Sequence, residues 1–433
     1  MTALIEILLI NGKLNNLTRK TISPPLGLAY LSAALSIKNI SNKVLDCNLE
    51  EALLNEILNN VTKNGIVAFS CMTPNYNFTV ALANKVRAIR PDLFMVLGGY
   101  HATLYADEII YSAAPFDAIL LGNGEESIVQ LYNDHKTKMY KCKPNIIYRV
   151  DRFNADFKVK STKWPNYIEP DRDAINLKKY VDLNSKFAGS VQFSRGCIYA
   201  CNFCSVQKVE GCWRAGDINQ LLREFELLHN VYGLNKNIVI VDNLFTGNKK
   251  IVMDFCDLLI DKNLRVKWSC DVRIDDIDEE LCEKMHEAGC VAFFVGLESG
   301  CDMTLSLIGG KPDKKLVSEK LAIVKEKGIN VNASFIIGMP WENEEMILET
   351  INYAIDLPLY SCEFSFATPF KHTRLYNQLF EYGAEIVDYN FDHWDGRTPV
   401  MKIKGITRKR LVELYLYAIS RKIEKESKND RTE

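Results

Sequence analysis

The chain has 433 residues, of which 47% are hydrophobic and 25% are charged, a composition typical of a globular protein with two or three domains. Its 53 Lys and Arg residues nearly balance its 55 Asp and Glu residues, which excludes a general attraction to nucleic acid or to anionic membranes. No apolar run approaches the roughly 18 residues that span a bilayer. The run of residues 4–10 contains Glu6 and follows no basic leader, so we expect a cytoplasmic protein that binds no membrane.

The first 135 residues alternate short apolar runs with segments of helical periodicity. In residues 26–37, for example, Leu28, Leu31 and Leu35 fall on one helical face. Strands that alternate with helices predict a doubly wound parallel sheet, with its ligand at the carboxyl ends of the strands. The predicted strands are residues 5–10, 43–46, 66–70, 94–97 and 118–121, and the clearest helices are residues 26–37 and 77–90.

Glycine-containing loops follow three of these predicted strands. Asn11-Gly12 follows the first, Gly98-Gly99-Tyr100-His101 the fourth and Gly122-Asn123-Gly124-Glu125 the fifth. Glycine lets a backbone approach a bulky ligand closely. The same glycines could equally make only tight turns.

Residues 136–188 have weak periodicity and are interpreted as a linker. From residue 189 a second series of strands and helices begins, and six such units predict a partial (β/α)6 barrel over residues 189–370, with its chemistry at the strand carboxyl ends. Residues 371–433 are expected to form a helical C-terminal region, with a charged helix at residues 407–425. The predicted barrel strands are residues 190–194, 238–241, 266–270, 291–296, 331–336 and 362–366, and helices are expected at residues 218–231 and 314–327.

A cysteine motif follows the first barrel strand. Cys197, Cys201 and Cys204 are separated by three and two residues, so one short loop can wrap three thiolates around a compact inorganic centre. Thiolate is the soft ligand that iron–sulfur clusters and zinc prefer. Three thiolates leave one iron of a four-iron cluster open. A zinc site completed by Cys212, or three unrelated core cysteines, are the alternatives.

The motif, with Phe203 before its third cysteine, resembles the signature of the radical S-adenosylmethionine (SAM) enzymes. The resemblance covers residues 189–369 and includes a segment at the carboxyl end of each following strand. These segments are Val241-Asp242-Asn243-Leu244-Phe245-Thr246, Trp268-Ser269-Cys270-Asp271-Val272-Arg273, Gly296-Leu297-Glu298-Ser299-Gly300 and Phe335-Ile336-Ile337-Gly338-Met339-Pro340.

This resemblance implies a 4Fe-4S cluster on the three cysteines, whose open iron binds S-adenosylmethionine. One electron, from a flavodoxin- or ferredoxin-type donor, then cleaves S-adenosylmethionine to methionine and a 5′-deoxyadenosyl radical. Each polar residue assigned to S-adenosylmethionine could instead serve a structural salt bridge. The residues expected to contact it are Phe203, Arg214, Asp242, Arg273, Glu298 and Ser299.

The N-terminal half resembles the cobalamin-binding domain that precedes the radical barrel in one branch of this family. The matching segments are Pro24-Pro25-Leu26-Gly27-Leu28-Ala29-Tyr30-Leu31, Gly98-Gly99-Tyr100-His101-Ala102-Thr103, Gly122-Asn123-Gly124-Glu125 and, in the linker, Glu169-Pro170-Asp171-Arg172-Asp173. The residues expected to contact cobalamin are Asn11, Gly12, Ser70, Met72, Thr73, Gly98, Gly99, His101, Gly122, Gly124 and Glu125.

One departure from that branch concerns the lower face of cobalt. Many cobalamin domains place a histidine ligand in an Asp-x-His-x-x-Gly loop after the first strand, whereas no histidine here precedes His101. The lower face is therefore expected to be open, water-bound or capped by residues 71–76. His101 is interpreted as a loop residue facing corrin or backbone, and not as the cobalt ligand.

The leading hypothesis is a cobalamin-dependent radical SAM enzyme that methylates an unactivated carbon of a small-molecule or natural-product-type substrate. Some relatives use the same pair of domains for cyclisation or ring contraction, so that reaction is an alternative. Sulfur insertion, as in methylthiotransferases, is another, but Cys47 and Cys71 would be only two thiols for a second cluster because Asn11 occupies the third strand end. A cobalamin or redox sensor without catalysis is the non-enzymatic alternative.

His372 replaces a glycine that is often found after the last barrel strand in relatives, which puts the conformation of that loop in doubt. Trp394 could line the substrate mouth or seal the barrel bottom.

Overall fold

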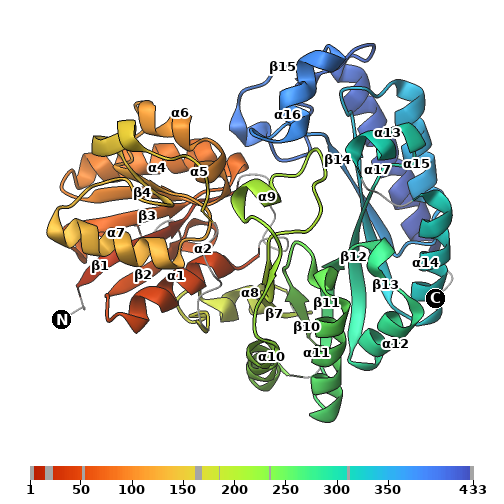
Figure 1. The fold of residues 1–433 in the computed structure, drawn as a ribbon, viewed down its shortest axis with the longest axis horizontal. Coiled ribbons are helices and arrows are strands. Elements are labelled where there is room, and N and C mark those ends of the chain that lie inside the picture. The colour runs from red at the N-terminus through yellow and green to blue at the C-terminus, as the bar shows by residue number, and fades with distance from the viewer. Residues whose placement is uncertain are drawn as a thin grey trace. The chain divides into compact units, whose positions relative to one another are not determined.

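The computed structural model describes residues 4–14, 23–50, 54–160, 168–184, 186–233, 236–309 and 313–429. The chain folds into two compact units (Figure 1). Unit 1 comprises Met1–Ser185 and Lys208–Gly211, and unit 2 comprises Lys186–Gln207 and Cys212–Glu433.

Unit 1 contains one six-stranded sheet with the strand order β2-β1-β3-β4-β5-β6, in which only the β5–β6 pair is antiparallel. Its strands are β1 (Ile5–Asn11), β2 (Asn42–Asp46), β3 (Val61–Ser70), β4 (Phe94–Gly98), β5 (Ala118–Leu120) and β6 (Ile146–Tyr148). Its helices are α1 (Leu26–Ile37), α2 (Cys47–Glu50), α3 (Leu54–Asn59), α4 (Tyr76–Ile89), α5 (Tyr100–Leu104), α6 (Ala106–Tyr111), α7 (Glu125–Thr137) and α8 (Leu177–Leu183).

Both faces of this sheet are buried, which confirms the predicted doubly wound architecture. On β1, Ile7 and Leu9 lie in a core cluster with α1 and α7, whereas Leu8 and Ile10 point to the opposite face, and all four are 0% exposed. Figure 1 shows α1 and α7 on one side of the sheet and α4, α5 and α6 on the other. The strand order reverses between β1 and β3, and this switch point is where such sheets bind ligands.

The segment interpreted as a linker carries more structure than its weak periodicity indicated. β6 pairs with β5, and η3 (Arg149–Asn154) and α8 follow it. β6 is only three residues long, IIY, too short to show an alternating pattern.

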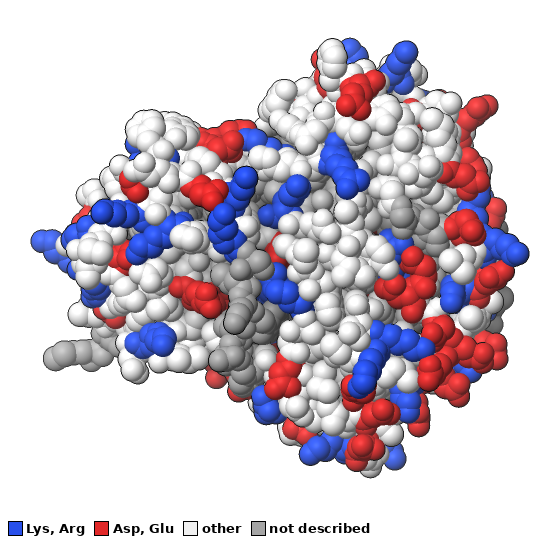
Figure 2. All heavy atoms as spheres, in the orientation of Figure 1, with Lys and Arg blue, Asp and Glu red and all other residues white. Residues whose placement is uncertain are grey.

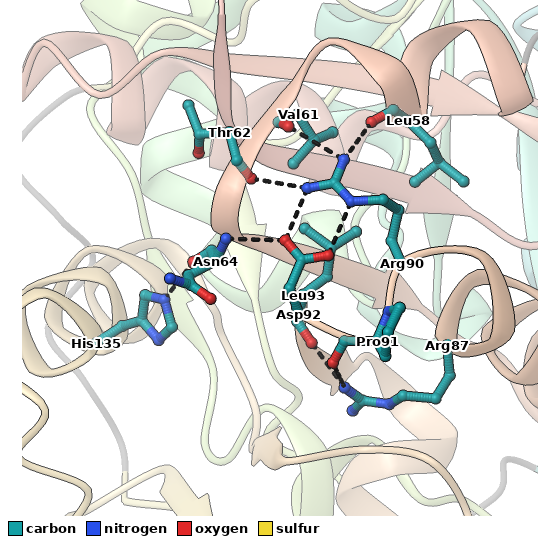
Figure 3. A network of polar contacts seen from close by, with 10 residues as sticks. All are labelled: Leu58, Val61, Thr62, Asn64, Arg87, Arg90, Pro91, Asp92, Leu93 and His135. Carbon is teal, nitrogen blue, oxygen red and sulfur yellow. Dashed lines mark hydrogen bonds and ion pairs between the residues drawn. The ribbon is translucent and has the colours of Figure 1, made fainter.

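A network of hydrogen bonds from Arg90 fixes the turn between α4 and β4 (Figure 3). The Arg90 guanidinium donates to both carboxylate oxygens of Asp92 at 2.8 Å. It also donates to the backbone carbonyls of Leu58 at 2.8 Å, Val61 at 3.2 Å and Thr62 at 3.2 Å. These bonds satisfy one carbonyl near the end of α3 and two at the start of β3, at the amino ends of the parallel strands.

Unit 2 contains an open sheet of six parallel strands in the order β7-β10-β11-β12-β13-β14. The predicted partial barrel is confirmed. The strands are β7 (Phe187–Val191), β10 (Asn237–Ile240), β11 (Lys267–Val272), β12 (Cys290–Glu298), β13 (Asn330–Ile337) and β14 (Ser361–Phe366). The helices are α9 (Val206–Val209), α10 (Ile218–Tyr232), α11 (Lys249–Asp261), α12 (Glu279–Glu287), α13 (Asp302–Ile308), α14 (Lys314–Glu326) and α15 (Glu344–Asp356).

Local sequence explains where these helices begin. The residue before each of five helices is Asp or Asn, and its side chain accepts a hydrogen bond from a backbone N–H of the first turn. These N-cap residues are Asp217, Asn248, Asp278, Asp313 and Asn343.

Aromatic packing joins the sheet of unit 2 to its helices. Trp268 of β11 is 0% exposed and lies edge-on to Phe225 of α10 and Phe255 of α11, with ring centroids 6.3 and 6.2 Å away. Its indole N–H donates to the Ala288 carbonyl at 2.9 Å. This side of β11 therefore faces the helices.

The C-terminal region ends in α17 (Arg408–Asn429), which confirms the predicted charged helix and packs against α15 and β14. Before it lie α16 (Arg374–Gln378) and the short hairpin of β15 (Glu385–Ile386) and β16 (Met401–Lys402). Among the described residues, no helix has both the length and the apolar character that a membrane crossing requires. On the face drawn in Figure 2, basic and acidic side chains are interspersed.

Candidate functional site

The three cysteines of the motif lie on a loop that leaves the first barrel strand, Gly196–Cys204, which we call the cluster loop. Its entrance is fixed by Asp242, which is 2% exposed. The Asp242 carboxylate accepts hydrogen bonds from the backbone N–H groups of Phe193 and Ser194, each at 2.8 Å, and from Ser194 Oγ at 2.6 Å. Asp242 therefore positions the start of the loop, a role that its sequence assignment as an S-adenosylmethionine contact did not include.

All three loop cysteines are half-buried and reduced. Burial, and to a lesser degree the nearby Cys201 and Cys197 thiols, raise the pKa of the Cys204 thiol to about 11. Within the described ranges, no three Cys, His, Asp or Glu side chains form a ready-made site for a single metal ion. A cubane spaces its ligands more widely than one ion does, because each thiolate binds a different iron, and binding of iron displaces the thiol protons. Three adjacent thiols on one loop fit that requirement.

Tyr199, inside the cysteine motif, connects the cluster loop to the next strands. The Arg273 guanidinium stacks on the Tyr199 ring at 3.8 Å, and its Nε and Nη2 donate to the two oxygens of Asp275 at 2.8 and 2.5 Å. Tyr199 Oη donates to Asp276 at 2.7 Å, and Thr246 Oγ1 donates to the same carboxylate at 2.8 Å. Tyr199, Thr246 and Asp276 were not predicted as site residues, because only the fold brings them together.

Glu298 ends β12 in a left-handed conformation, with φ of +70°. This conformation is uncommon for a residue other than glycine, and it follows a register shift between β12 and β13. Glu298 is 7% exposed, and its carboxylate lies within electrostatic reach of the Cys204 thiol. Strain of this kind concentrates at functional sites.

The other predicted S-adenosylmethionine contacts differ in burial and in whether their side chains are already hydrogen-bonded within the protein. Ser299 is 1% exposed; its Oγ lies 2.8 Å from Thr350 Oγ1 and accepts the Cys301 N–H at 3.0 Å. Phe203 is half-buried on the cluster loop, and Arg214 is half-buried in the short strand β9 (Arg214–Ala215). The structure thus brings Arg273, Glu298 and Phe203 to the cluster loop, whereas the hydroxyl group of Ser299 is engaged in the loop after β12.

A buried carboxylate supports the loop after β13. Glu342 is 2% exposed and accepts hydrogen bonds from the backbone N–H groups of Gly338 and Met339 at 2.8 and 2.9 Å and from Thr304 Oγ1 at 3.1 Å. Burial raises the pKa of Glu342 to about 7, although these hydrogen bonds lower it. Trp394, by contrast, is a core residue of the C-terminal region, 3% exposed, whose indole N–H donates to the Asp388 carbonyl at 3.0 Å.

In unit 1, the predicted cobalamin contacts lie at or just beyond the carboxyl ends of the parallel strands. The register sets Asn11, Ser70 and Gly98 side by side at the carboxyl ends of β1, β3 and β4. Asn11 Nδ2 donates to Asp46 at 3.0 Å, and Tyr180 Oη of α8 donates to the other oxygen of Asp46. The side chain of Asn11 is thereby fixed at the switch point.

The side chain of Asn75 joins the loops after β1 and β3 through hydrogen bonds that we call the Asn75 brace. Asn75 is 2% exposed; its Nδ2 donates to the Gly12 carbonyl at 2.9 Å and its Oδ1 accepts the Met72 N–H at 2.9 Å. A Cβ atom at Gly12 would meet Thr79 Oγ1 at 2.6 Å, so only glycine fits. The side chain of Met72 is 47% exposed beside this brace.

The glycines after β4 and β5 hold the remaining loops. Gly99 has φ of +97°, and a Cβ atom there would lie 2.6 Å from the Cys71 carbonyl, so the loops after β3 and β4 pack backbone to backbone. Thr103 Oγ1 accepts the Gly122 N–H at 3.0 Å, which ties the loop after β5 to α5. Gly124 and Glu125 begin α7, and Thr73 begins the turn η2 (Thr73–Asn75).

His101 is not the loop residue that the sequence indicated. It lies in helix α5 and is 0% exposed, between the rings of Tyr76 and Tyr105, whose centroids are 4.1 and 4.5 Å away. Its Nδ1 is 3.3 Å from Thr73 Oγ1. Burial lowers the pKa of His101 to about 3, so the imidazole is neutral and supports the fold at the switch point.

Comparison with known proteins follows the same division of the chain. A model of the radical SAM superfamily matches residues 191–354, and a model of the B12 binding domain matches residues 12–132. Over 405 residues the chain is 28% identical to an uncharacterized methyltransferase of Pyrococcus horikoshii, with 91% of this chain and 86% of the relative covered.

Two further relatives extend the comparison. The chain is 25% identical over 402 residues to an anaerobic magnesium-protoporphyrin IX monomethyl ester cyclase of Rubrivivax gelatinosus, covering 90% of this chain and 72% of the relative. The radical S-adenosylmethionine methyltransferase TsrM of Kitasatospora setae has a similar fold, with a TM-score of 0.70 at 17% identity over 85% of this chain and 76% of that one. The chain belongs to the radical SAM superfamily, in the branch that carries a B12 binding domain, and its cofactors are a 4Fe-4S cluster, S-adenosylmethionine and cobalamin.

Proposed function

We propose that this enzyme transfers a methyl group from S-adenosylmethionine to an unactivated carbon of a small molecule. The observation that carries the proposal is the combination of two sites in one chain: a loop with three cysteines, and a switch point whose first-strand loop contains no histidine. The relative named a methyltransferase matches the chain across both units, which supports this reaction.

In this proposal Cys197, Cys201 and Cys204 bind three irons of the cluster. Arg273 and Glu298 hold the polar groups of S-adenosylmethionine, since both are anchored beside the cluster loop. When bound, the cluster supplies the electron that cleaves S-adenosylmethionine, and cobalamin carries the methyl group. The electron donor is of the flavodoxin or ferredoxin type.

On unit 1, Asn11, Ser70, Gly98 and Gly99 cradle cobalamin at the strand ends, and Met72 lies on the loop proposed to cover its lower face. The brace of Asn75 supports this assignment, because it fixes the Met72 backbone to the Gly12 loop before any ligand binds. A preorganised loop binds a ligand without the cost of ordering it.

Two other reactions of related enzymes give different products. Cyclisation, named for the Rubrivivax gelatinosus relative, would consume S-adenosylmethionine without producing S-adenosylhomocysteine. Sulfur insertion needs a second cluster on unit 1, but Cys71 is 0% exposed and burial raises the pKa of its thiol far above the usual range. Cys47 is 3% exposed. Two buried thiols disfavour that cluster.

The test is a product analysis under anaerobic conditions. The protein is reconstituted with iron and sulfide, with or without cobalamin, reduced, and given S-adenosylmethionine. We expect 5′-deoxyadenosine whenever the cluster is present and S-adenosylhomocysteine only when cobalamin is present. If the cobalamin-loaded protein forms 5′-deoxyadenosine but no S-adenosylhomocysteine, methyl transfer is wrong and cyclisation is favoured.

A further inference from the structure

The alternation of side chains along the strands of unit 2 defines an inner face of the open barrel. On β11, Trp268 and Cys270 are 0% exposed on the side that faces the helices. Asp271 directly follows Cys270, so its side chain points to the opposite, inner face. On β12, Phe293 is likewise 0% exposed, and its neighbour Phe294 lies on the inner face.

The strand register aligns four inner-face side chains at one level. Asp271 pairs with Phe294, and Phe294 pairs with Asn332 of β13. The register of β10 and β11 sets Val241, one residue beyond their last pair, level with Asp271. We call Val241, Asp271, Phe294 and Asn332 the inner row.

Two members of the inner row are large apolar side chains that remain open to solvent. Val241 is 40% exposed and Phe294 is 39% exposed, although parallel sheets are normally covered on both faces. Leaving this surface in water is unfavourable, and exposed apolar patches of this kind mark binding sites.

Asp271 has acceptor capacity that the protein itself does not use. Within the described part of the chain, no residue donates a hydrogen bond to its carboxylate. Burial and the neighbouring charge of Asp242 raise the pKa of Asp271 to about 7. Arg273, the next inward-pointing residue of this chain segment, does not offset this charge, because it is bound to Asp275 and stacked on Tyr199.

We propose that the inner row recognises the substrate: its apolar body packs on Val241 and Phe294, and an amine or other N–H donor on it pairs with Asp271. This inference rests on the proposed function and specifies its substrate class as a small apolar molecule that carries a nitrogen donor. A carboxylate or phosphate at the same place would face the charges of Asp271 and Asp242 and would bind poorly.

The test uses three probes with the same phenyl body and different end groups: 3-phenylpropylamine, 3-phenylpropan-1-ol and 3-phenylpropionate. Their dissociation constants are measured by calorimetry at pH 8 with the reconstituted protein, both without and with saturating S-adenosylmethionine. We expect the amine to bind about tenfold more tightly than the alcohol, the size of one charge-assisted hydrogen bond, and the acid to bind most weakly.

Two variants assign the contacts and a third is the control. Asp271→Asn should bring the affinities for amine and alcohol close together, and Phe294→Ala should weaken binding of both alike. The control is Asp254→Asn, which removes the same charge from α11, where Asp254 pairs with Lys250; it should keep the tenfold preference. Circular dichroism of each variant confirms that it is folded.

The inference is overturned if the wild type does not prefer the amine, if Asp271→Asn keeps the preference, or if saturating S-adenosylmethionine abolishes amine binding. The last result would assign the inner row to S-adenosylmethionine itself. Formation of 5′-deoxyadenosine and S-adenosylhomocysteine by the wild type without probe is measured in parallel. Product formation tests the proposed methyl transfer and does not depend on the probes. Failure of the inner-row proposal can therefore be distinguished from failure of the proposed function.

Discussion

At the scale of single residues, the cluster loop offers three thiols for three ligand positions and no substitute. We therefore expect Cys204→Ala to lose most of its iron after anaerobic reconstitution and to form no 5′-deoxyadenosine. Cys212→Ala is the matched control, because Cys212 is exposed and lies outside the cluster loop; it should keep the wild-type iron content and absorption spectrum. Iron loss in the control would revive a four-thiolate site.

His372 adopts a backbone conformation that glycine favours. It has φ of +69°, the left-handed conformation that costs most residues about 1–2 kcal/mol and glycine almost nothing. We expect His372→Val to lower the free energy of unfolding by about 1–2 kcal/mol relative to His372→Gly, because a β-branched side chain fits this conformation least. Urea denaturation of both variants measures the difference; equal stabilities would contradict the assignment.

The sequence suggests which residues are candidate ligands of the site, but it does not indicate which residues hold them in place. The cysteines, Arg273 and Glu298 are candidates because they fall at strand ends, which a predicted (β/α) series locates without coordinates. Tyr199 stacking on Arg273 and the Asn75 brace depend on residues far apart in the chain. The left-handed conformation of Glu298 could not be predicted from the sequence, because glutamate is not a residue type that favours it.

At the scale of elements, the loop between β13 and α15 depends on the protonation of Glu342. Burial raises its pKa to about 7, above the ordinary value of 4.5, so the folded state binds this proton more tightly than the unfolded state does. The contribution of Glu342 to stability is therefore highest at low pH and falls as the pH rises from about 4.5 to about 7.

Glu342→Gln should remove this dependence, because the amide oxygen can still accept the N–H bonds of Gly338 and Met339 but does not ionise. Between pH 5 and pH 8 we expect the unfolding free energy of the wild type to fall relative to that of the variant, by on the order of 1–3 kcal/mol. Chemical denaturation at several pH values measures this. Parallel pH profiles for the two proteins would mean that Glu342 ionises normally.

Strands and helices were predictable where the pattern was long enough to be read. α1 was predicted at residues 26–37 and is found at Leu26–Ile37, because its apolar residues repeat over three turns. β6 and α8 were missed, since a three-residue strand carries no alternation and α8 is stabilised by tertiary contacts such as that between Tyr180 and Asp46.

At the scale of the whole molecule, the chain passes between its two units three times. Lys208–Gly211 lies just after the cluster loop in sequence but belongs to unit 1, where Tyr100 Oη donates to Glu210. The sequence predicted a single passage through a linker. A four-residue excursion has no compositional signature, and its contacts with residues about 110 positions away are set only by the fold.

The histidines of the whole chain bear on the cobalt environment. Of the six histidines, only His101 and His135 belong to unit 1. His101 is buried between two tyrosine rings. His135 lies with Nε2 at 2.7 Å from the Asn64 carbonyl and with Nδ1 at 2.9 Å from Tyr140 Oη, at the sheet edge away from the strand carboxyl ends (Figure 3). Neither imidazole of unit 1 is presented at the switch point.

Bound cobalamin should therefore lack a protein nitrogen ligand, and we expect it to be base-off, with its own dimethylbenzimidazole also away from cobalt. In the electron paramagnetic resonance spectrum of the Co(II) form, an imidazole nitrogen splits each high-field cobalt line into three, and we expect no such splitting from the wild type. Met72→His supplies the positive control, because Met72 is 47% exposed on the loop proposed to lie under the corrin; this variant should gain the splitting. Met139→His, at an exposed position beyond α7, should not. Splitting in the wild type would contradict this prediction: either the dimethylbenzimidazole of cobalamin itself binds cobalt, or a histidine leaves its packed position when cobalamin binds. If Met72→His gains no splitting, the loop after β3 does not lie under the lower face.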